Sequence, residues 1–259
     1  MSKLEKPNNL VQSVDRTLNV LEKIINSENG ITVTELSNSL DIHKSTVHRL
    51  LSTLAYRKYI KKDKNNLYFP GIKLLEIGSQ TLNKSDMRKE IKPYLEKLMK
   101  KTEETIHLGI LDDNEVIYID KVESPHTIRM YSSIGKRAPV HCTGLGKVLI
   151  AFSSQEDIEN FLETKKLKKY TENTITKPEE FKENLKKIKK RGYSIDNQEH
   201  EVNINCIASP IFDHKGNVLA AFSISGPSNR MTLETIQELK TMVLQYSKKI
   251  SACFGYNNL

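Results

Sequence analysis

The segment Pro139–Leu149 carries residue types that could hold an anion. Its sequence, PVHCTGLGKVL, places Gly144 and Gly146 at the opening of an apolar helical pattern. Glycines let backbone N–H groups approach a ligand closely, and a helix N-terminus favours negative charge. The amides of Gly144 and Leu145 are therefore candidate donors to a carboxylate, although the glycines would equally allow close packing alone. The segment lacks the Gly-Lys-Ser/Thr of a phosphate-binding loop.

A nucleophilic thiol is the second chemistry to consider. Cys206 could act with His141 or His200 as its base, but it begins an apolar strand pattern, and the sequence identifies no acid that would orient either histidine. A metal site from His141, Cys142 and Cys206 has no recognised ligand spacing. We therefore expect no catalytic residue, no metal and no cofactor, and keep a cysteine-dependent enzyme using Cys206 as the alternative. The cysteines are odd in number, form no CxxC pair and are expected to be free thiols.

A third candidate chemistry is recognition of phosphate by a basic cluster. The 259-residue chain has a formal net charge of +8, and residues 43–64 contain seven Lys or Arg against one acid, Asp63. Such a cluster is often only a solvated face. The elements that carry it decide between the two interpretations.

Those elements have the pattern of a helix-turn-helix. A stripe at Val14, Leu18, Leu21 and Ile25 predicts a first helix that ends before Gly30. The capping-box pattern TVTE at 32–35 starts a second helix, which should bury Val33, Leu36 and Leu40. After a short connection, apolar residues at i, i+3, i+4 and i+7 define a third: Val47, Leu50, Leu51 and Leu54.

The polar face of the third helix favours DNA. It carries Ser45, Arg49 and Ser52, flanked by His48 and Thr53, and no acid occurs between Asp41 and Asp63. A solvated helix normally mixes Glu with Lys, whereas a helix lying along phosphates should exclude carboxylates. We expect it to read the major groove with Ser45, Thr46, His48 and Arg49, while Lys44 and Lys62 contact phosphate.

A basic hairpin follows the third helix. Residues 59–62 and 67–69 have strand composition, residues 63–66 form a polar turn, and Pro70-Gly71 should end the second strand. A basic hairpin after a recognition helix is typical of a wing, which contacts the backbone or minor groove. An ordinary surface hairpin is the alternative.

The rest of the chain alternates strand-like and helical patterns. A stripe at Ile72, Leu75, Ile77 and Leu82 leads to Ser85 or Asp86, which can cap a helix to about Lys101. Beyond it we expect an α/β or α+β domain. Its strands are expected at 105–111, 116–122, 207–212 and 218–225, and its helices at 144–152, 179–191 and 233–254. The run KKIKKR at 186–191 is expected to complement a helix dipole.

No apolar run approaches the roughly 18 residues of a membrane span, and residues 1–16 lack the apolar stretch of a secretory signal. We therefore expect a cytoplasmic protein with no membrane partner.

Taken together, the motifs resemble the IclR family of bacterial transcriptional regulators, in order from about Leu10 to Phe254. The resemblance rests on VQSVDR at 11–16, KSTVHRLL at 44–51, the glycines and Lys147 after His141, Gly192-Tyr193, CIA at 206–208 and SISGP at 223–227. It is similar to members that regulate sugar-acid use, such as the 2-keto-3-deoxygluconate regulator.

The resemblance implies an α+β fold. A winged helix-turn-helix DNA-binding domain would cover 10–72, a linker helix 73–86, and an effector-binding domain 87–256 with a six-stranded, GAF-like antiparallel sheet. The family's pocket, carried over to this chain, comprises Met130, Gly144, Leu145, Asp196, Ile204, Cys206, Ser223 and Ser225. Gln198 stands where an acid is common and Asn203 where Gly is usual, so the effector's identity stays open.

The expected function is sequence-specific DNA binding, as a repressor controlled by a small organic acid, either a 2-oxo or a sugar acid. An activator of the same fold is the second alternative. The expected partners are a near-palindromic double-stranded DNA operator, a small carboxylate effector, and further copies of the chain in a homodimer or homotetramer.

Overall fold

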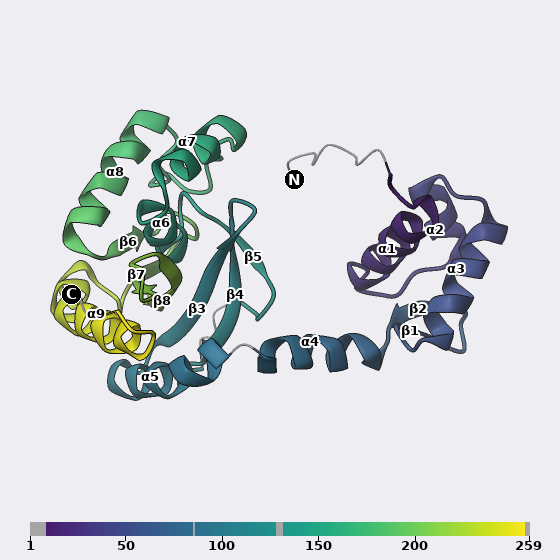
Figure 1. Cartoon of the computed structure of the whole chain (residues 1–259), viewed down its shortest axis with the longest axis horizontal. Helices are drawn as coiled ribbons and strands as arrows, with labels where there is room; N and C mark the ends of the chain where they lie inside the picture. The colour runs from purple at the N-terminus through teal and green to yellow at the C-terminus, as the bar shows by residue number, and fades with distance from the viewer. Residues whose placement is uncertain (1–8, 85, 128–131, 257–259) are drawn as a thin grey trace. The chain divides into compact units, whose positions relative to one another are not determined.

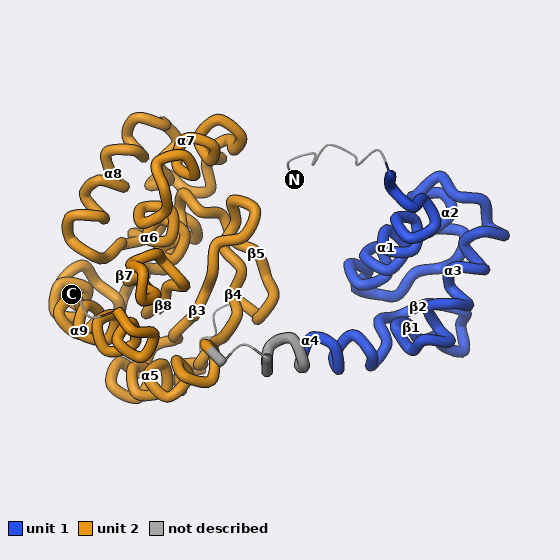
Figure 2. The backbone as a smooth tube through the Cα atoms, viewed as in Figure 1, with its two compact units in different colours: residues 1–85 blue, residues 86–259 orange. Residues whose placement is uncertain are grey.

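The structure is a computed structural model that describes residues 9–84, 86–127 and 132–256. The chain divides into two compact units, residues 1–85 and 86–259 (Figure 2). Each unit has its own buried apolar core among the described residues.

Three helices form the core of unit 1: α1 (Gln12–Ile25), α2 (Val33–Leu40) and α3 (Lys44–Tyr56). The predicted capping box is present, because Thr32 Oγ1 accepts from the Glu35 amide and the Glu35 carboxylate accepts from the Thr32 amide. Asp41 ends α2 in the left-handed conformation, with φ 52°. The short α2–α3 connection and the packing of the two helices confirm the helix-turn-helix.

A two-stranded antiparallel hairpin, β1 (Ile60–Lys62) and β2 (Tyr68–Pro70), follows α3. It confirms the predicted hairpin. The one difference is that Pro70 belongs to β2, whereas the sequence predicted that the strand would stop before it. Ile60 and Tyr68 pack into the core formed by α1, α2 and α3. A Cβ on Gly71 would lie 2.2 Å from the Lys58 carbonyl oxygen, so the chain can leave the hairpin here only with glycine.

Two apolar stripes of unit 1 are less buried than their periodicity predicts. In α1, Leu21 is buried together with Val20 and Ile24, but Val14 and Leu18 are about half exposed. In α4 (Ile72–Lys84), Ile72 is also largely exposed. Each helix has apolar residues on more than one face, and the core of unit 1 covers only one of them.

Unit 2 is built on a six-stranded antiparallel sheet with the order β5-β4-β3-β8-β7-β6 (Figure 1). Its strands are β3 (Thr105–Asp112), β4 (Glu115–Val122), β5 (Arg137–Pro139), β6 (Ser194–Asn197), β7 (Ile204–Phe212) and β8 (Val218–Pro227). The four long strands match the sequence prediction. The short edge strands β5 and β6 were not predicted.

Helices cover both faces of this sheet (Figure 1). One core joins α5 and α9 to the sheet, and the other joins α6, α7 and α8 to it. The helices are α5 (Asp86–Thr102), α6 (Gly144–Ala151), α7 (Gln155–Thr164), α8 (Pro178–Arg191) and α9 (Leu233–Cys253). The sequence did not predict α7, although Ser154 and Asp157 form its capping box. The basic run ends α8, as predicted, before Gly192 at φ 80°.

Within the ranges described, no helix is both long enough and apolar enough to cross a membrane.

Candidate functional site

The outer face of α3 is a solvent-exposed polar surface. Lys44, Ser45, His48 and Arg49 are exposed and Thr46 is half-buried, while Val47, Leu51 and Leu54 fix the opposite face in the core. Neither Lys44 nor Arg49 makes an ion pair among the residues of 9–84 that the structure describes. These side chains are therefore available to an external partner.

Two hydroxyls on this face are already engaged. Ser52 Oγ donates to the His48 carbonyl at 2.9 Å, and Thr53 Oγ1 donates to the Arg49 carbonyl at 3.0 Å. Both remain exposed, but their donors are directed along the helix.

Lys62 lies at the end of β1, exposed, with its Nζ 5.6 Å from the centroid of the Tyr68 ring. The hairpin thus presents this cation through strand pairing with β2 and not through a flexible loop. A positive charge on a hairpin beside a cationic helix suits a phosphate backbone.

Unit 2 contains a cavity of about 200 Å³ that is partly open to solvent. It lies among residues from α6 and from strands β3, β4, β5, β6, β7 and β8 and their connections. Seven of the eight residues predicted for the pocket line it: Gly144, Leu145, Asp196, Ile204, Cys206, Ser223 and Ser225. The eighth, Met130, lies outside the described residues.

The N-terminus of α6 supplies two backbone donors to this cavity. Thr143 caps the helix by accepting from the Gly146 amide at 3.1 Å, and its carbonyl accepts from the Lys147 amide. The amides of Gly144 and Leu145 have no acceptor among the residues described. Buried N–H groups at a helix start favour an anion.

The two glycines of α6 have different roles. A Cβ on Gly146 would lie 2.4 Å from the Cα and carbonyl oxygen of Val140, so Gly146 is required for packing. A Cβ on Gly144 would meet its nearest atoms, in Ala208 and Cys206, at 3.4 Å, which is ordinary contact. The anion-binding interpretation therefore concerns Gly144 and Leu145, while Gly146 serves the fold.

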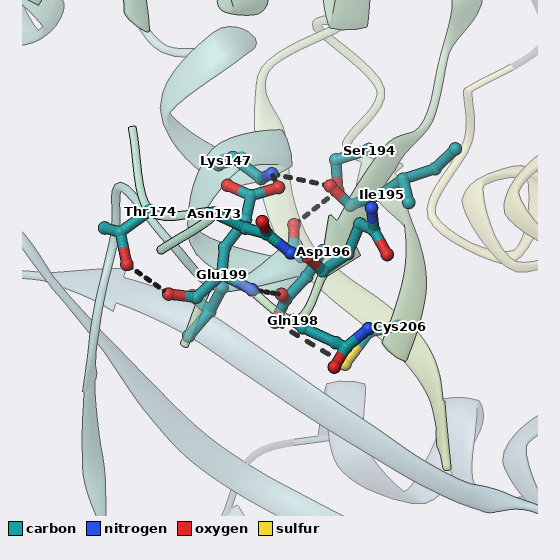
Figure 3. A network of polar contacts seen from close by, with 12 residues as sticks. Lys147, Asn173, Thr174, Ser194, Ile195, Asp196, Gln198, Glu199 and Cys206 are labelled. Atoms are coloured by element: carbon teal, nitrogen blue, oxygen red, sulfur yellow. Dashed lines mark hydrogen bonds and ion pairs between the residues drawn. The ribbon is translucent and has the colours of Figure 1, made fainter. Parts of the chain in front are cut away.

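Asp196 is the buried acid of the cavity and is 3% exposed. Burial raises its pKa to about 7, Lys147 opposes this shift and Glu199 adds to it. Its Oδ1 accepts from the Glu199 amide at 2.8 Å, and the Cys206 thiol donates to Oδ2 at 3.8 Å (Figure 3). Near neutral pH the carboxyl can therefore be an acceptor or, once protonated, a donor.

The polar wall opposite α6 comes from β8 and β3. Ser223 and Ser225 lie two residues apart on β8 with their hydroxyl oxygens 3.3 Å apart, so both face the same side of the sheet. His107 on β3 pairs with Ser223, and its Nε2 lies 2.7 Å from Ser132 Oγ. Burial lowers the pKa of His107 to about 3, so its ring is neutral at physiological pH.

Several lining residues were missed by the sequence reasoning. They are His107, Tyr118, Ser132, Lys136, Arg137, Ala138, Thr143, His200 and Glu201. Tyr118 and His107 stand on strands that were predicted, and their alternation along those strands was a usable signal. The others depend on how β5 and the loops fold back onto the sheet, which the sequence pattern does not indicate.

The structure does not support a thiol nucleophile at Cys206. Burial raises the pKa of this thiol well above its ordinary value, and its hydrogen-bond partner is the acid Asp196 rather than a histidine. His141 Nε2 bonds instead to the Lys168 carbonyl at 2.9 Å. The three cysteines are free, and no cluster suited to a metal ion occurs among the residues described.

A helix-turn-helix with an exposed cationic face, in one chain with a domain that contains a polar cavity, defines a DNA-binding transcription regulator with an effector domain. The family model "Bacterial transcriptional regulator IclR C-terminal" matches residues 79–252, and the model "IclR helix-turn-helix domain" matches residues 13–64. The chain belongs to the IclR family, as the sequence motifs indicated.

Relatives agree with this assignment. The chain is 37% identical to the HTH-type transcriptional regulator KdgR of Escherichia coli K12, over 98% of this chain and 97% of that protein. It is 35% identical to the transcriptional repressor IclR of the same strain, over 95% and 90%. The crystal structure of Thermotoga maritima IclR superposes with a TM-score of 0.79 at 34% identity, covering 95% of this chain and all of that one. All three are transcription regulators, so an enzymatic function is not favoured.

Proposed function

We propose that the protein is a repressor whose DNA binding is controlled by a small organic acid, a 2-oxo or sugar acid, held in the cavity of unit 2. One observation carries this proposal. The unengaged amides of Gly144 and Leu145 share one cavity with Asp196, Ser223 and Ser225. Donors for a carboxylate and partners for hydroxyl groups are thus combined in one site.

The proposed ligand has both a carboxylate and a hydroxyl, or a hydrated 2-oxo group. An ionised Asp196 would repel an anion at the start of α6. Because its pKa lies near 7, Asp196 can instead donate to the ligand as a carboxylic acid or accept from a ligand hydroxyl. Met130, Leu145 and Ile204 are proposed as apolar walls, while Cys206 contacts the ligand through its neutral thiol.

On the DNA side we propose that α3 enters the major groove. Ser45, Thr46, His48 and Arg49 would contact base edges, and Lys44 and Lys62 would contact phosphate. The DNA-binding domain is proposed to span 10–72, the linker 73–86 and the effector domain 87–256. We assign the protein to the cytoplasm, because a bacterial DNA-binding regulator must be in the compartment that contains the chromosome.

The operator is proposed to be a near-palindrome bound by a homodimer or homotetramer, since symmetric oligomers present equivalent recognition helices to two half-sites. Repression is supported by the relatives described as repressors in E. coli and Salmonella typhimurium. Footprinting on the gene's own upstream region tests the symmetry. Protection of one asymmetric half-site by a monomer would contradict it.

Effector binding is tested by thermal-shift screening of the full chain against 2-oxo acids and sugar acids. A ligand at 100 times its dissociation constant adds about 2.7 kcal/mol to the free energy of unfolding. Asp196→Ala should abolish the ligand's influence on operator binding and leave ligand-free operator binding intact, because α3 belongs to the other unit. A normal response in Asp196→Ala would show that the ligand lies elsewhere.

A further inference from the structure

Lys147 is a buried cation that the predicted pocket does not use. It lies in α6, whose residues Gly144–Ala151 are all buried, and its side chain is 1% exposed. A charged amine in such a place needs acceptors. Its Nζ donates to the Ile195 carbonyl at 2.5 Å and forms an ion pair with Glu199 (Figure 3).

The two acceptors of Lys147 stand on either side of Asp196 in the sequence. Ile195 immediately precedes Asp196, and Glu199 is the residue whose amide donates to Asp196 Oδ1. One cation therefore binds both ends of the turn that presents the buried acid. Gln198, within this turn, has a φ of 55°, a left-handed conformation that must be held in place by its surroundings.

The same turn is fixed from its other side by a neighbouring loop. Thr171 Oγ1 donates to the Gln198 carbonyl at 2.6 Å, and Thr174 Oγ1 donates to the Glu199 carbonyl at 2.6 Å. Asn173 Nδ2 donates to the Asn197 carbonyl at 3.0 Å. None of these three side chains lines the cavity, so their bonds position residues 197–199 without touching a ligand.

A second bond joins α6 to β6. Ser194 Oγ donates to the Gly144 carbonyl at 2.5 Å, one residue after the helix cap. With Lys147, it fixes Asp196 relative to the amides of Gly144 and Leu145. Asp196 and these amides all line the cavity or face it from the start of α6.

We propose that Lys147, with Glu199, is a positioning residue that sets the separation and orientation of Asp196 relative to the α6 amides, and thereby determines which hydroxy acids the cavity accepts. The inference rests on the proposed effector function. A ligand whose carboxylate binds at α6 can reach Asp196 with a hydroxyl only at the spacing that this clamp maintains. Without the clamp, the preference for hydroxylated acids over their deoxy counterparts falls.

The test uses the full chain and the double variant Lys147→Met/Glu199→Gln. Removing both charges avoids an unpaired buried carboxylate, which would endanger folding. The control is Lys92→Met/Asp120→Asn, which removes another Lys–carboxylate pair with a buried acid, on the side of the sheet that α5 covers. It differs from the Lys147–Glu199 pair in that Lys92 is partly exposed and Asp120 also pairs with Arg88. Ser194→Ala is a milder second variant, because it removes only the bond to the Gly144 carbonyl.

The first measurement needs no ligand. Amide hydrogen exchange of residues 196–201 should be at least tenfold faster in the double variant than in wild type, and unchanged in the control. Unchanged exchange in Lys147→Met/Glu199→Gln overturns the clamp.

The second measurement compares matched acids by thermal shift and calorimetry: gluconate against hexanoate, and glycerate against propionate. The ratio of affinities, hydroxy acid over deoxy acid, should fall at least tenfold in the double variant, less in Ser194→Ala and not at all in the control. Faster exchange with an unchanged ratio would show a structural role only and overturn the proposal. If wild type binds none of the four acids, the proposed ligand class is contradicted. The exchange measurement still tests whether Lys147 and Glu199 hold residues 196–201 in place.

Discussion

The α3 surface and the unit 2 cavity use polar side chains in opposite ways. On α3, Lys44 and Arg49 are exposed and make no ion pair among the described residues of unit 1, so they contribute little to the fold. In unit 2, Asp196 lines the cavity and the Lys147–Glu199 pair lies behind it, and all three are buried and bonded to the backbone of β6 and its turn. Substitutions on the α3 surface should therefore leave the free energy of unfolding unchanged. Substitutions around the cavity should change both ligand binding and stability.

The largest effect is expected from Lys147→Met alone. It leaves the buried Glu199 carboxylate without its cation, and breaking a buried pair costs about 3–5 kcal/mol of unfolding free energy. Urea unfolding measures this loss, and adding Glu199→Gln should restore a large part of it. Lys182→Met, which removes a cation from an exposed pair with Glu179, should change stability by less than about 0.5 kcal/mol. Similar losses of unfolding free energy in Lys147→Met and Lys182→Met would contradict the expected difference between buried and exposed ion pairs.

Arg49→Ala should show the reverse behaviour. Loss of a bidentate contact to guanine costs about 1–3 kcal/mol of operator binding and relaxes sequence preference. The urea midpoint should stay unchanged because Arg49 is exposed. Gel shifts on operator and on scrambled DNA measure the effect, with Lys187→Ala in unit 2 as the control for one lost positive charge. Unchanged affinity and preference would exclude Arg49 from the interface.

The cavity should bind its acid less tightly as the pH rises through 7. Below its pKa of about 7, Asp196 is neutral and can donate to a ligand; above it, the ionised carboxylate repels the anion. The affinity for gluconate should therefore fall above pH 7, by at most about tenfold per pH unit for a single proton.

The groups that face Asp196 do not cancel this dependence. The effects of Lys147 and Glu199 are already included in its shifted pKa. Burial lowers the pKa of His107 to about 3, so its ring stays neutral from pH 6 to 8, and burial also lowers the pKa of His200. Calorimetry from pH 6 to 8 checks the prediction, and Asp196→Asn should flatten the profile. An Asp196→Asn profile as steep as that of wild type would assign the proton to another group.

Lys62→Ala should have the smallest effect, below about 1 kcal/mol. A phosphate contact from the hairpin weakens binding to all DNA sequences alike and lowers the slope of log affinity against log salt by about 1. Salt titrations with operator and non-specific DNA measure both quantities. A loss confined to the operator would mean that Lys62 reads bases.

The same contrast explains what could be predicted from the sequence. The face of α3 follows from one helical period, since Val47, Leu51 and Leu54 fix which residues are exposed. The cavity residues lie on strands far apart in the chain, and their grouping required the family resemblance. The clamp could not be predicted, because Lys147 and Glu199 are 52 residues apart and a lysine in an apolar helix carries no signal of its partner.

Periodicity also has a limit within unit 1. It predicted α1 correctly, but the half-exposed Val14 and Leu18 show that an apolar stripe need not be the buried one. A helix with several apolar faces offers more candidates than one small core can cover. Edge strands as short as β5 and β6 are missed for a related reason, since three or four residues contain at most two full alternations.

The independence of the α3 surface from its own core has a practical consequence for engineering. Ser45, His48 and Arg49 can be randomised in a library without repacking Val47, Leu51 or Leu54. If α3 reads the operator as proposed, selection on a reporter promoter would change the operator sequence that is recognised and leave the effector domain unaltered. On that proposal, substitutions at only three positions would redirect the regulator to a different promoter.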